Sequence, residues 1–352
     1  MAEALHAGVA QATQLRLIGR RAGVFLLVAA AAGLPLVASD FQLFRLTNVL
    51  IYAIALLGLN ILAGYNGQIS LGHGAFYAIG GYAAAILVAH FAVPHWAAVP
   101  IAGIACLVAG FAFGWPTLRL GGMHFAMATF ALGAVLPIVA KSRGVEAWTG
   151  GSQGLALDQP PVPFDLPLSF DQWMYLFTLL VLVLSFASAA NLLRGRIGRA
   201  IVAIRDHPIA AEATGIHAGY YKSAALGVSA MYAGIAGALA AVALQYVAPG
   251  LYGIFLSFGF LVGVAVGGFA TLSGALYGAV FLQILLAAVG ATAGALHTSN
   301  VLLIYGITLI LVVHFMPGGV ASLIERARAR LRCARFSSTC PRTSDRPGSM
   351  TP

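Results

Sequence analysis

Charged residues are scarce in this sequence: Asp, Glu, Lys and Arg make up only 8% of its 352 residues, whereas 60% of the residues are hydrophobic. Because soluble domains carry a charge on about a quarter of their residues, this composition excludes an ordinary water-soluble protein. The 102 residues from 223 to 324 contain no charged side chain. That length can supply about four membrane-spanning helices of roughly 20 apolar residues each. The sequence therefore predicts an all-α, polytopic transmembrane helical bundle.

Other absences argue against several kinds of protein. The three cysteines, Cys106, Cys333 and Cys340, are too few and too scattered for a disulfide framework. The chain has no Gly-x-x-x-x-Gly-Lys-Ser/Thr phosphate-binding loop, so we do not expect it to hydrolyse ATP. No Asp or Glu lies within a predicted span, which argues against a proton-coupled carrier. No cluster of histidines and carboxylates indicates an enzyme, a metal site or a cofactor.

Apolar windows predict about ten spans, and the division at 272/274 is the least sharply defined. The first window, with Arg16, Arg20 and Arg21 before it and Ser39 after it, also fits a secretory signal peptide, so that alternative stays open. The ten windows are 22–38, 45–64, 75–93, 96–114, 123–140, 172–191, 223–247, 254–272, 274–292 and 300–316.

The distribution of basic residues predicts the topology. If both termini are cytoplasmic, 16 of the 19 Lys and Arg residues fall in cytoplasmic segments, and only Arg45, Lys141 and Arg143 fall outside. These short basic clusters indicate topology rather than a nucleic-acid partner. We therefore predict a cytoplasmic segment at 1–21, a transmembrane domain at 22–320 and a basic, disordered cytoplasmic tail at 321–352. The domain has an external loop at about 141–171 and a cytoplasmic loop at about 192–222.

Residues 64–74 form a polar, glycine-rich segment between two apolar windows. They include four glycines together with Asn66, Gln68, Ser70 and His73. Lipid cannot satisfy free backbone groups, so such a segment is buried in protein, lines a cavity or lies at the membrane interface. It is either a plain cytoplasmic turn or a broken, re-entrant element, and it lacks the Lys and Arg of the other cytoplasmic loops.

Glycines recur at four-residue spacing near the end of the chain. Gly259, Gly263 and Gly267 form one series, and Gly274 and Gly278 form another. Small residues at this spacing let helices approach closely in lipid, so ordinary helix packing is the first interpretation. A subunit interface or a place on the translocation path is the alternative.

Arg119 and His124 flank two glycines at the start of the fifth predicted span. Arg119 can extend to the lipid headgroups, and His124 can form a hydrogen bond between helices. The alternative to these structural roles is that His124 lies on a solute path and has a function there.

The cytoplasmic residues 198–222 predict a short helix outside the membrane. Asp206 can cap it, Pro208 fits its first turn and Gly215 can end it. A helix of about two turns is unstable alone in water, so it needs a supporting surface. That surface is either the membrane interface or a second protein.

Four blocks together resemble one known family. They are residues 57–76, 149–155, 198–222 and 267–279, and together they span most of residues 50–320. They resemble the permeases of branched-chain amino acid ABC importers, specifically the longer of the two homologous permease subunits. Four matches in order are far more specific than any one alone.

The resemblance implies a bacterial cytoplasmic (inner) membrane protein that is not an enzyme. It implies a homologous second permease, two cytoplasmic ABC ATPases that hydrolyse ATP, and a periplasmic or extracellular solute-binding protein. The implied coupling helix for the ATPases contains Arg205, Asp206, Ala210, Ala211, Glu212, Ala213 and Gly215. The candidate residues of the translocation path or gate are Asn60, Asn66, Gln68, Ser70, His73, His124, Gly267 and Gly268.

The sequence also departs from the family pattern. The pair Asp206-His207 is followed by Pro208, His124 replaces a usual tyrosine, and Phe269-Ala270 replaces a usual Leu-Gly. The expected solutes are leucine, isoleucine and valine, and urea or a short amide is the alternative within the same transporter class. A secondary transporter or a channel, which would need no ATPase, is the alternative from another class.

Overall fold

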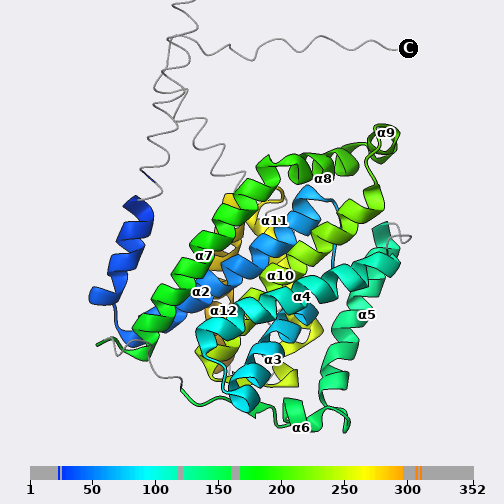
Figure 1. Cartoon of the computed structure of the whole chain (residues 1–352). Helices are drawn as coiled ribbons and strands as arrows, with labels where there is room; N and C mark the ends of the chain where they lie inside the picture. Colours follow the sequence, from blue (N-terminus) through cyan, green and yellow to red (C-terminus); the bar gives the residue numbers. More distant parts are fainter. Residues whose placement is uncertain are drawn as a thin grey trace, which may run out of the picture.

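The computed structural model describes residues 26–117, 122–159 and 167–295, together with the single residues 23, 306, 307 and 310. The described chain is mainly helical (Figure 1). The predicted N-terminal segment at 1–21 and tail at 321–352, together with Arg119, lie outside the described residues, and so does almost all of the predicted span at 300–316.

Seven of the described helices are long and apolar enough to cross a membrane, which confirms a polytopic helical membrane protein. Two shorter apolar helices are Leu26–Leu36 and α11, Ile254–Gly267. The count of ten spans and the cytoplasmic location of both termini stay predictions. The seven candidate spans are α2 with its π-helical extension (Asp40–Tyr65), α3 (His73–Phe91), α4 (His95–Thr117), α5 (Gly122–Ala140), α7 (Phe170–Arg194), α10 (Ala218–Leu244) and α12 (Leu272–Ala295).

The predicted division between the eighth and ninth spans at 272/274 is wrong. Helix α11 ends at Gly267, and α12 begins at Leu272, so the break is residues 268–271. The backbone explains its position, because Gly268 has a φ of 109° and Ala270 a φ of 57°, and neither conformation can continue an α-helix.

Helices α2 and α10 form the centre of the bundle. Within their most apolar windows, 72% of α2 and 83% of α10 is buried, compared with 22% of α5 and 28% of α7. Helix α10 packs against α2, α3 and α4. Its surface is rich in Gly and Ala, which lets these helices approach closely where lipid supplies no hydrophobic driving force.

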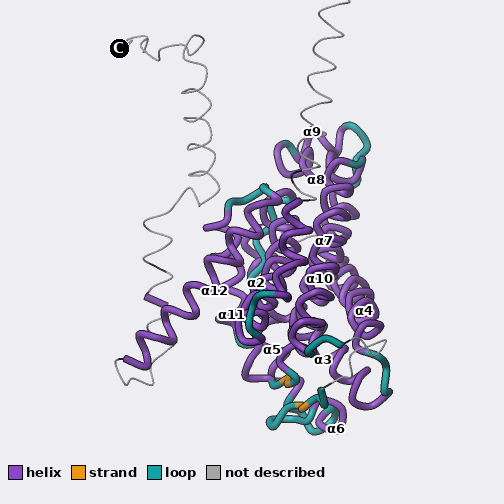
Figure 2. The backbone as a smooth tube through the Cα atoms, turned by 90° about the vertical axis from the view of Figure 1, so that its left-hand side faces the viewer, coloured by secondary structure: helices purple, strands orange, loops and turns teal. Residues whose placement is uncertain are grey.

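The connections gather at the two ends of the bundle. Helices α8 (Arg196–Asp206) and α9 (Pro208–Ala213) lie at one end (Figures 1 and 2). The opposite end carries α6 (Glu146–Thr149), strands β1 (Leu155–Ala156) and β2 (Tyr246–Val247), and the 3-10 helix η4 (Pro249–Tyr252). The two strands pair antiparallel, with Leu155 opposite Val247. The predicted loops at 141–171 and 192–222 therefore lie at opposite ends.

A capping box begins α7. The hydroxyl of Ser169 accepts a hydrogen bond from the Gln172 amide at 3.3 Å, and the Gln172 side chain accepts one from the Ser169 amide at 3.1 Å. These two bonds satisfy amide groups that a helix start otherwise leaves without partners. The helix consequently starts just before the predicted span at 172–191.

Candidate functional site

Residues 66–72, here named the return segment, lead the chain back into the bundle. Helix α2 ends in a π-helical turn, Asn60–Tyr65, and the next helix starts at His73. Nε2 of His73 lies 3.1 Å from the carbonyl oxygen of Ala55. Ala55 precedes Tyr65 by about 15 Å of helix at 1.5 Å per residue, so the return segment brings the chain back alongside α2 to a point from which His73 reaches this carbonyl. This geometry fits a broken, re-entrant element and not a plain turn.

Side chains from two other helices hold the return segment and the start of α3. The hydroxyl of Thr129 on α5 accepts a hydrogen bond from the Leu71 amide at 3.0 Å, and Ser257 on α11 accepts one from the Gly74 amide at 3.0 Å. Gly72 lies so close to the Thr129 carbonyl that a β-carbon would overlap it. Protein thus covers the end of the return segment that enters the bundle, at Ser70 and Gly72, whereas Gly67 and Ile69 are exposed.

The polar residues Ser70 and His73 are both fully buried. The Ala55 carbonyl is only an acceptor, so Nε2 of His73 carries the hydrogen and Nδ1 is left as an acceptor. Within the described residues, neither that Nδ1 nor the Ser70 hydroxyl has a hydrogen-bond partner. These two groups can therefore still form hydrogen bonds inside the bundle, at the end of the return segment and the start of α3.

The side chain of Asn60 joins α2 to the break between α11 and α12. Its amide nitrogen donates to the Thr271 carbonyl at 2.7 Å, and its amide oxygen accepts from the Ala270 amide at 2.9 Å. Both bonds are made by a side chain that is only 1% exposed. The structure therefore joins Asn60 to the break that begins at Gly268, another predicted path residue. The positive φ of Ala270 favours glycine, so the sequence departure at this position adds strain.

Helices α8 and α9, with the turn at His207, are here named the coupling segment. The prediction that Asp206 caps the short helix is wrong: the capping position is His207, whose side chain makes no capping bond. Asp206 is instead the last residue of α8, and its carboxylate pairs with the Arg205 side chain at 2.9 Å. The cause is that α8 continues through Asp206, and Pro208 starts the new helix at its first position.

The short helix α9 rests on the rest of its own chain. Ala211 is buried against Ile204 of α8 and Ala218 of α10. The helix ends at Ala213, and Gly215, whose φ is 83°, follows the capping residue Thr214 and ends the helical turn as predicted. Ile209 is 85% exposed, and the predicted coupling residues Ala210, Glu212 and Ala213 are exposed as well. One face of α9 therefore packs within this chain, and the other face is open.

Sequence reasoning missed helix α8. Its buried residues are Gly198, Ala200, Ile201 and Ile204, which occupy one face of the helix. The spacing of Ile197, Ile201 and Ile204 by four and three residues is the pattern of an amphipathic helix, and it could have identified α8.

Arg205 connects the coupling segment to the end of α2. Its Nη1 donates to the Gly64 carbonyl at 2.9 Å, which satisfies a carbonyl that the helix end leaves free. Gly67 has a φ of 72°, and a β-carbon there would lie 2.8 Å from Cγ of Arg205. The Arg205 side chain is therefore packed directly against the return segment.

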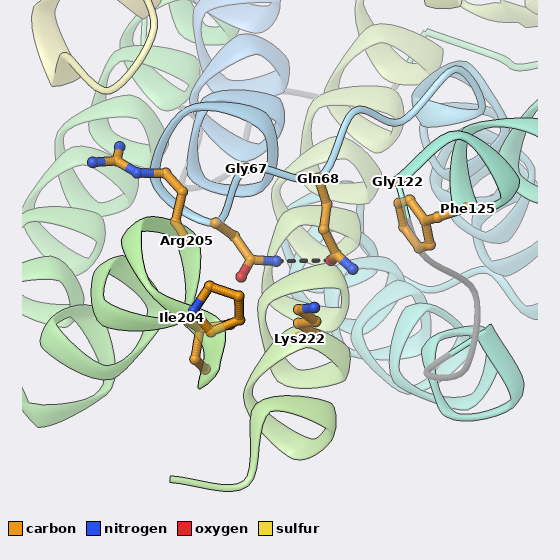
Figure 3. Close-up of a pocket in the computed structure, with 9 residues that line it drawn as sticks. Gly67, Gln68, Gly122, Phe125, Ile204, Arg205 and Lys222 are labelled. Atoms are coloured by element: carbon orange, nitrogen blue, oxygen red, sulfur yellow. Dashed lines mark hydrogen bonds between the residues drawn. The ribbon is translucent and has the colours of Figure 1, made fainter. Parts of the chain in front are cut away.

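A pocket of about 220 Å³ lies between the return segment, α5 and the coupling segment. In Figure 3 the guanidinium group of Arg205 points away from Gln68 and Lys222, in agreement with its bond to Gly64. Asn66 donates from its amide nitrogen to Oε1 of Gln68 at 2.7 Å. The pocket is lined by Asn66, Gly67, Gln68, Gly122, Phe125, Ile204, Arg205, Pro208 and Lys222.

The structure does not bring all the predicted path residues together. Asn66 and Gln68 line the pocket, but His124 lies on the exposed face of α5. Gly267 packs against the carbonyl of Gly274 where α11 meets α12. The glycine series thus serves the close helix packing expected from its spacing.

The family of this chain follows from a comparison with known proteins. A family model described as "Branched-chain amino acid transport system / permease component" matches residues 42–313. The chain belongs to this permease family. The match runs from the start of α2 through α12 and includes the coupling segment. It confirms the resemblance inferred from the four sequence blocks.

Two relatives of this permease are both named "High-affinity branched-chain amino acid transport system permease protein LivM". The Escherichia coli (strain K12) protein is 34% identical over 249 residues, which cover 64% of this chain and 58% of the relative. The Salmonella typhimurium protein is 32% identical over 281 residues, which cover 73% of this chain and 66% of the relative. The permease thus spans less than two thirds of the length of either relative. No solved structure matches it.

Proposed function

We propose that this chain is the permease subunit of an ATP-driven ABC importer that carries leucine, isoleucine and valine across a bacterial cytoplasmic membrane. In this proposal it forms the translocation path with a homologous permease. Two cytoplasmic ATPases supply the energy, and a solute-binding protein outside the membrane delivers the solute. Membership of the permease family and the names of the two relatives support this assignment.

The observation that carries the coupling role is a chain of polar contacts from the coupling segment to the α11–α12 break. Arg205 bonds to the carbonyl of Gly64 at 2.9 Å. Gly64 lies in the same π-helical turn as Asn60, and Asn60 holds the backbone of Ala270 and Thr271. Displacement of α8 would therefore move the end of α2 and the break together.

The exposed face of α9 is the proposed contact for an ATPase. Because Ala211 packs against Ile204 and Ala218, a push on α9 would be passed to α8. Closure of an ATPase dimer against Ile209 and Glu212 would displace both helices as a unit. The contacts through Arg205 and Asn60 would then open the path alternately to the two sides of the membrane.

The substrate is tested by uptake of labelled leucine in a strain lacking this gene and in the same strain with the gene restored. Unlabelled valine and urea serve as competitors. Gene-dependent uptake that valine blocks and urea does not is the expected result. Gene-dependent uptake of urea without uptake of leucine would replace the proposed substrate with the alternative within the ABC class.

The transporter class is tested with proteoliposomes. The full complex should transport only when ATP is supplied to the ATPase side. Transport by this single chain, without ATPases or ATP, would instead identify a secondary transporter or a channel.

A further inference from the structure

We infer that the pocket between the return segment and the coupling segment binds a free aliphatic amino acid from the cytoplasm, and that its occupation slows transport. This inference rests on the proposed function, because it makes the transported solute also the ligand of a second, inhibitory site. The pocket lies where the coupling segment meets the bundle, and two of the predicted path or gate residues, Asn66 and Gln68, line it.

The pocket contains a cation suited to a carboxylate. Lys222, near the start of α10, lines the pocket and forms no ion pair with another residue in the described parts of the chain. Arg205 is already engaged, with Asp206 through Nε and with Gly64 through Nη1. Among the described residues that line this pocket, the Lys222 ammonium group is thus the cation free to receive a ligand carboxylate.

The pocket also contains an acceptor suited to an ammonium group. Asn66 is 3% exposed, and its Oδ1 has no hydrogen-bond partner within the described residues. Oε1 of Gln68 accepts one bond from Asn66 and keeps a second lone pair. The Asn66 oxygen is covered by protein, so Oε1 of Gln68 is the acceptor that a ligand ammonium group would use. Gln68 and Lys222 both line the pocket (Figure 3).

The remaining wall is apolar and suits an aliphatic side chain. Phe125 of α5 and Ile204 of α8 are each 2% exposed and line the pocket, and Pro208 lines it at the start of α9. The volume of about 220 Å³ lies below the roughly 300–1,000 Å³ of sites for drug-sized ligands, so the occupant must be small. A free carboxylate, a free ammonium group and a short apolar side chain together describe an aliphatic amino acid.

The position of the pocket connects ligand binding to the movement of α8. One wall is the return segment, and another is Ile204 and Pro208 of the coupling segment. A ligand that contacts both walls stabilises the arrangement in which they lie together, and it opposes the movement of α8 that transport requires. Accumulated product would therefore reduce its own import.

Binding is tested first on the purified complex of this chain with its partner permease and ATPases, without the solute-binding protein. Labelled leucine is the probe. We expect saturable binding that weakens at least tenfold in Lys222→Met and is unchanged in Lys141→Met. The control is matched because Lys141 is the other lysine of the sequence, and it lies at the end of α5 away from the coupling segment. Absent binding, or equal binding in Lys222→Met, would overturn the inference.

Inhibition is tested in proteoliposomes that contain the complex with leucine on the ATPase side. We expect ATP-driven leucine uptake to fall several-fold with this leucine present, and Lys222→Met to restore it. If the rate of leucine uptake does not change with leucine on the ATPase side, the inference is wrong and the proposed function is unaffected. If leucine is not taken up at all, the proposed substrate fails, and the binding measurement decides the pocket on its own.

Discussion

Arg205 and Gly64 are 141 residues apart in the sequence, yet Nη1 of Arg205 donates a hydrogen bond to the Gly64 carbonyl at 2.9 Å. This bond joins α8, which lies at one end of the bundle, to the π-helical turn that ends α2. Nε of Arg205 also pairs with the Asp206 carboxylate at 2.9 Å. Two nitrogens of the guanidinium group, Nε and Nη1, are therefore held by different partners. Movement of the coupling segment therefore acts directly on α2.

Substitution Arg205→Met should uncouple ATP hydrolysis from transport. It removes a bond from a charged donor, worth roughly 1.5–3 kcal/mol, while it keeps most of the apolar stem that packs on Gly67. We expect uptake per ATP hydrolysed to fall at least fivefold in proteoliposomes. Arg199→Met is the matched control, because Arg199 lies on the same helix and bonds only to the nearby Arg194 carbonyl in the described structure. An unchanged ratio in Arg205→Met would refute the coupling role.

Substitution Asn60→Leu should destabilise the whole assembly. It removes the hydrogen-bond partner of the part-buried Ala270 amide, at a cost of about 1–3 kcal/mol. The Thr271 carbonyl loses one of its two bonds and keeps the bond from the Gly274 amide at 3.1 Å. We expect a clearly lower Tm of the purified complex. Asn48→Leu is the control, since Asn48 is on the same helix and bonds only within it, to the Phe44 carbonyl. Equal shifts in the two variants would contradict a special role for Asn60.

Substitution Gly72→Ala should displace α5 from the return segment. The added methyl group overlaps the Thr129 carbonyl, and overpacking of this kind costs typically about 1–3 kcal/mol. We expect less folded protein in the membrane and a lower Tm. Gly133→Ala probes the same interface with only ordinary contacts, the nearest at 3.5 Å to Gly72, and should be tolerated. A tolerated Gly72→Ala would mean that α5 does not pack as described.

Substitution Ile209→Asp should weaken binding of the ATPases without unfolding the chain. Ile209 is 85% exposed, so its replacement costs little in the permease alone. Burial of such a side chain in a partner is worth about 1.5–3 kcal/mol, which corresponds to roughly a tenfold to hundredfold change in affinity. Co-purification of the ATPases measures the effect, and Ile197→Asp on α8 tests whether it is confined to α9. Full retention of the ATPases in Ile209→Asp would show that α9 is not their contact.

The sequence by itself determined the class of protein and many of its helices. Scarcity of charge and long apolar windows predict membrane spans, because lipid imposes the same requirement on every residue of a span. The glycines and polar residues of 64–74 predicted a break in helix, and Gly215 predicted the end of α9. These signals are local, so they can be recognised without knowledge of the packing.

Only the tertiary structure decided which polar residues meet. Asn60 and Thr271 are 211 positions apart, and their bond depends on how α11 and α12 lie against α2. In the structure His124 is exposed on α5, and Asp206 forms an ion pair with Arg205 instead of capping α9. Such contacts depend on the rotation of each helix about its axis. That rotation is set by the fit of small side chains along whole interfaces, which no local pattern in the sequence records.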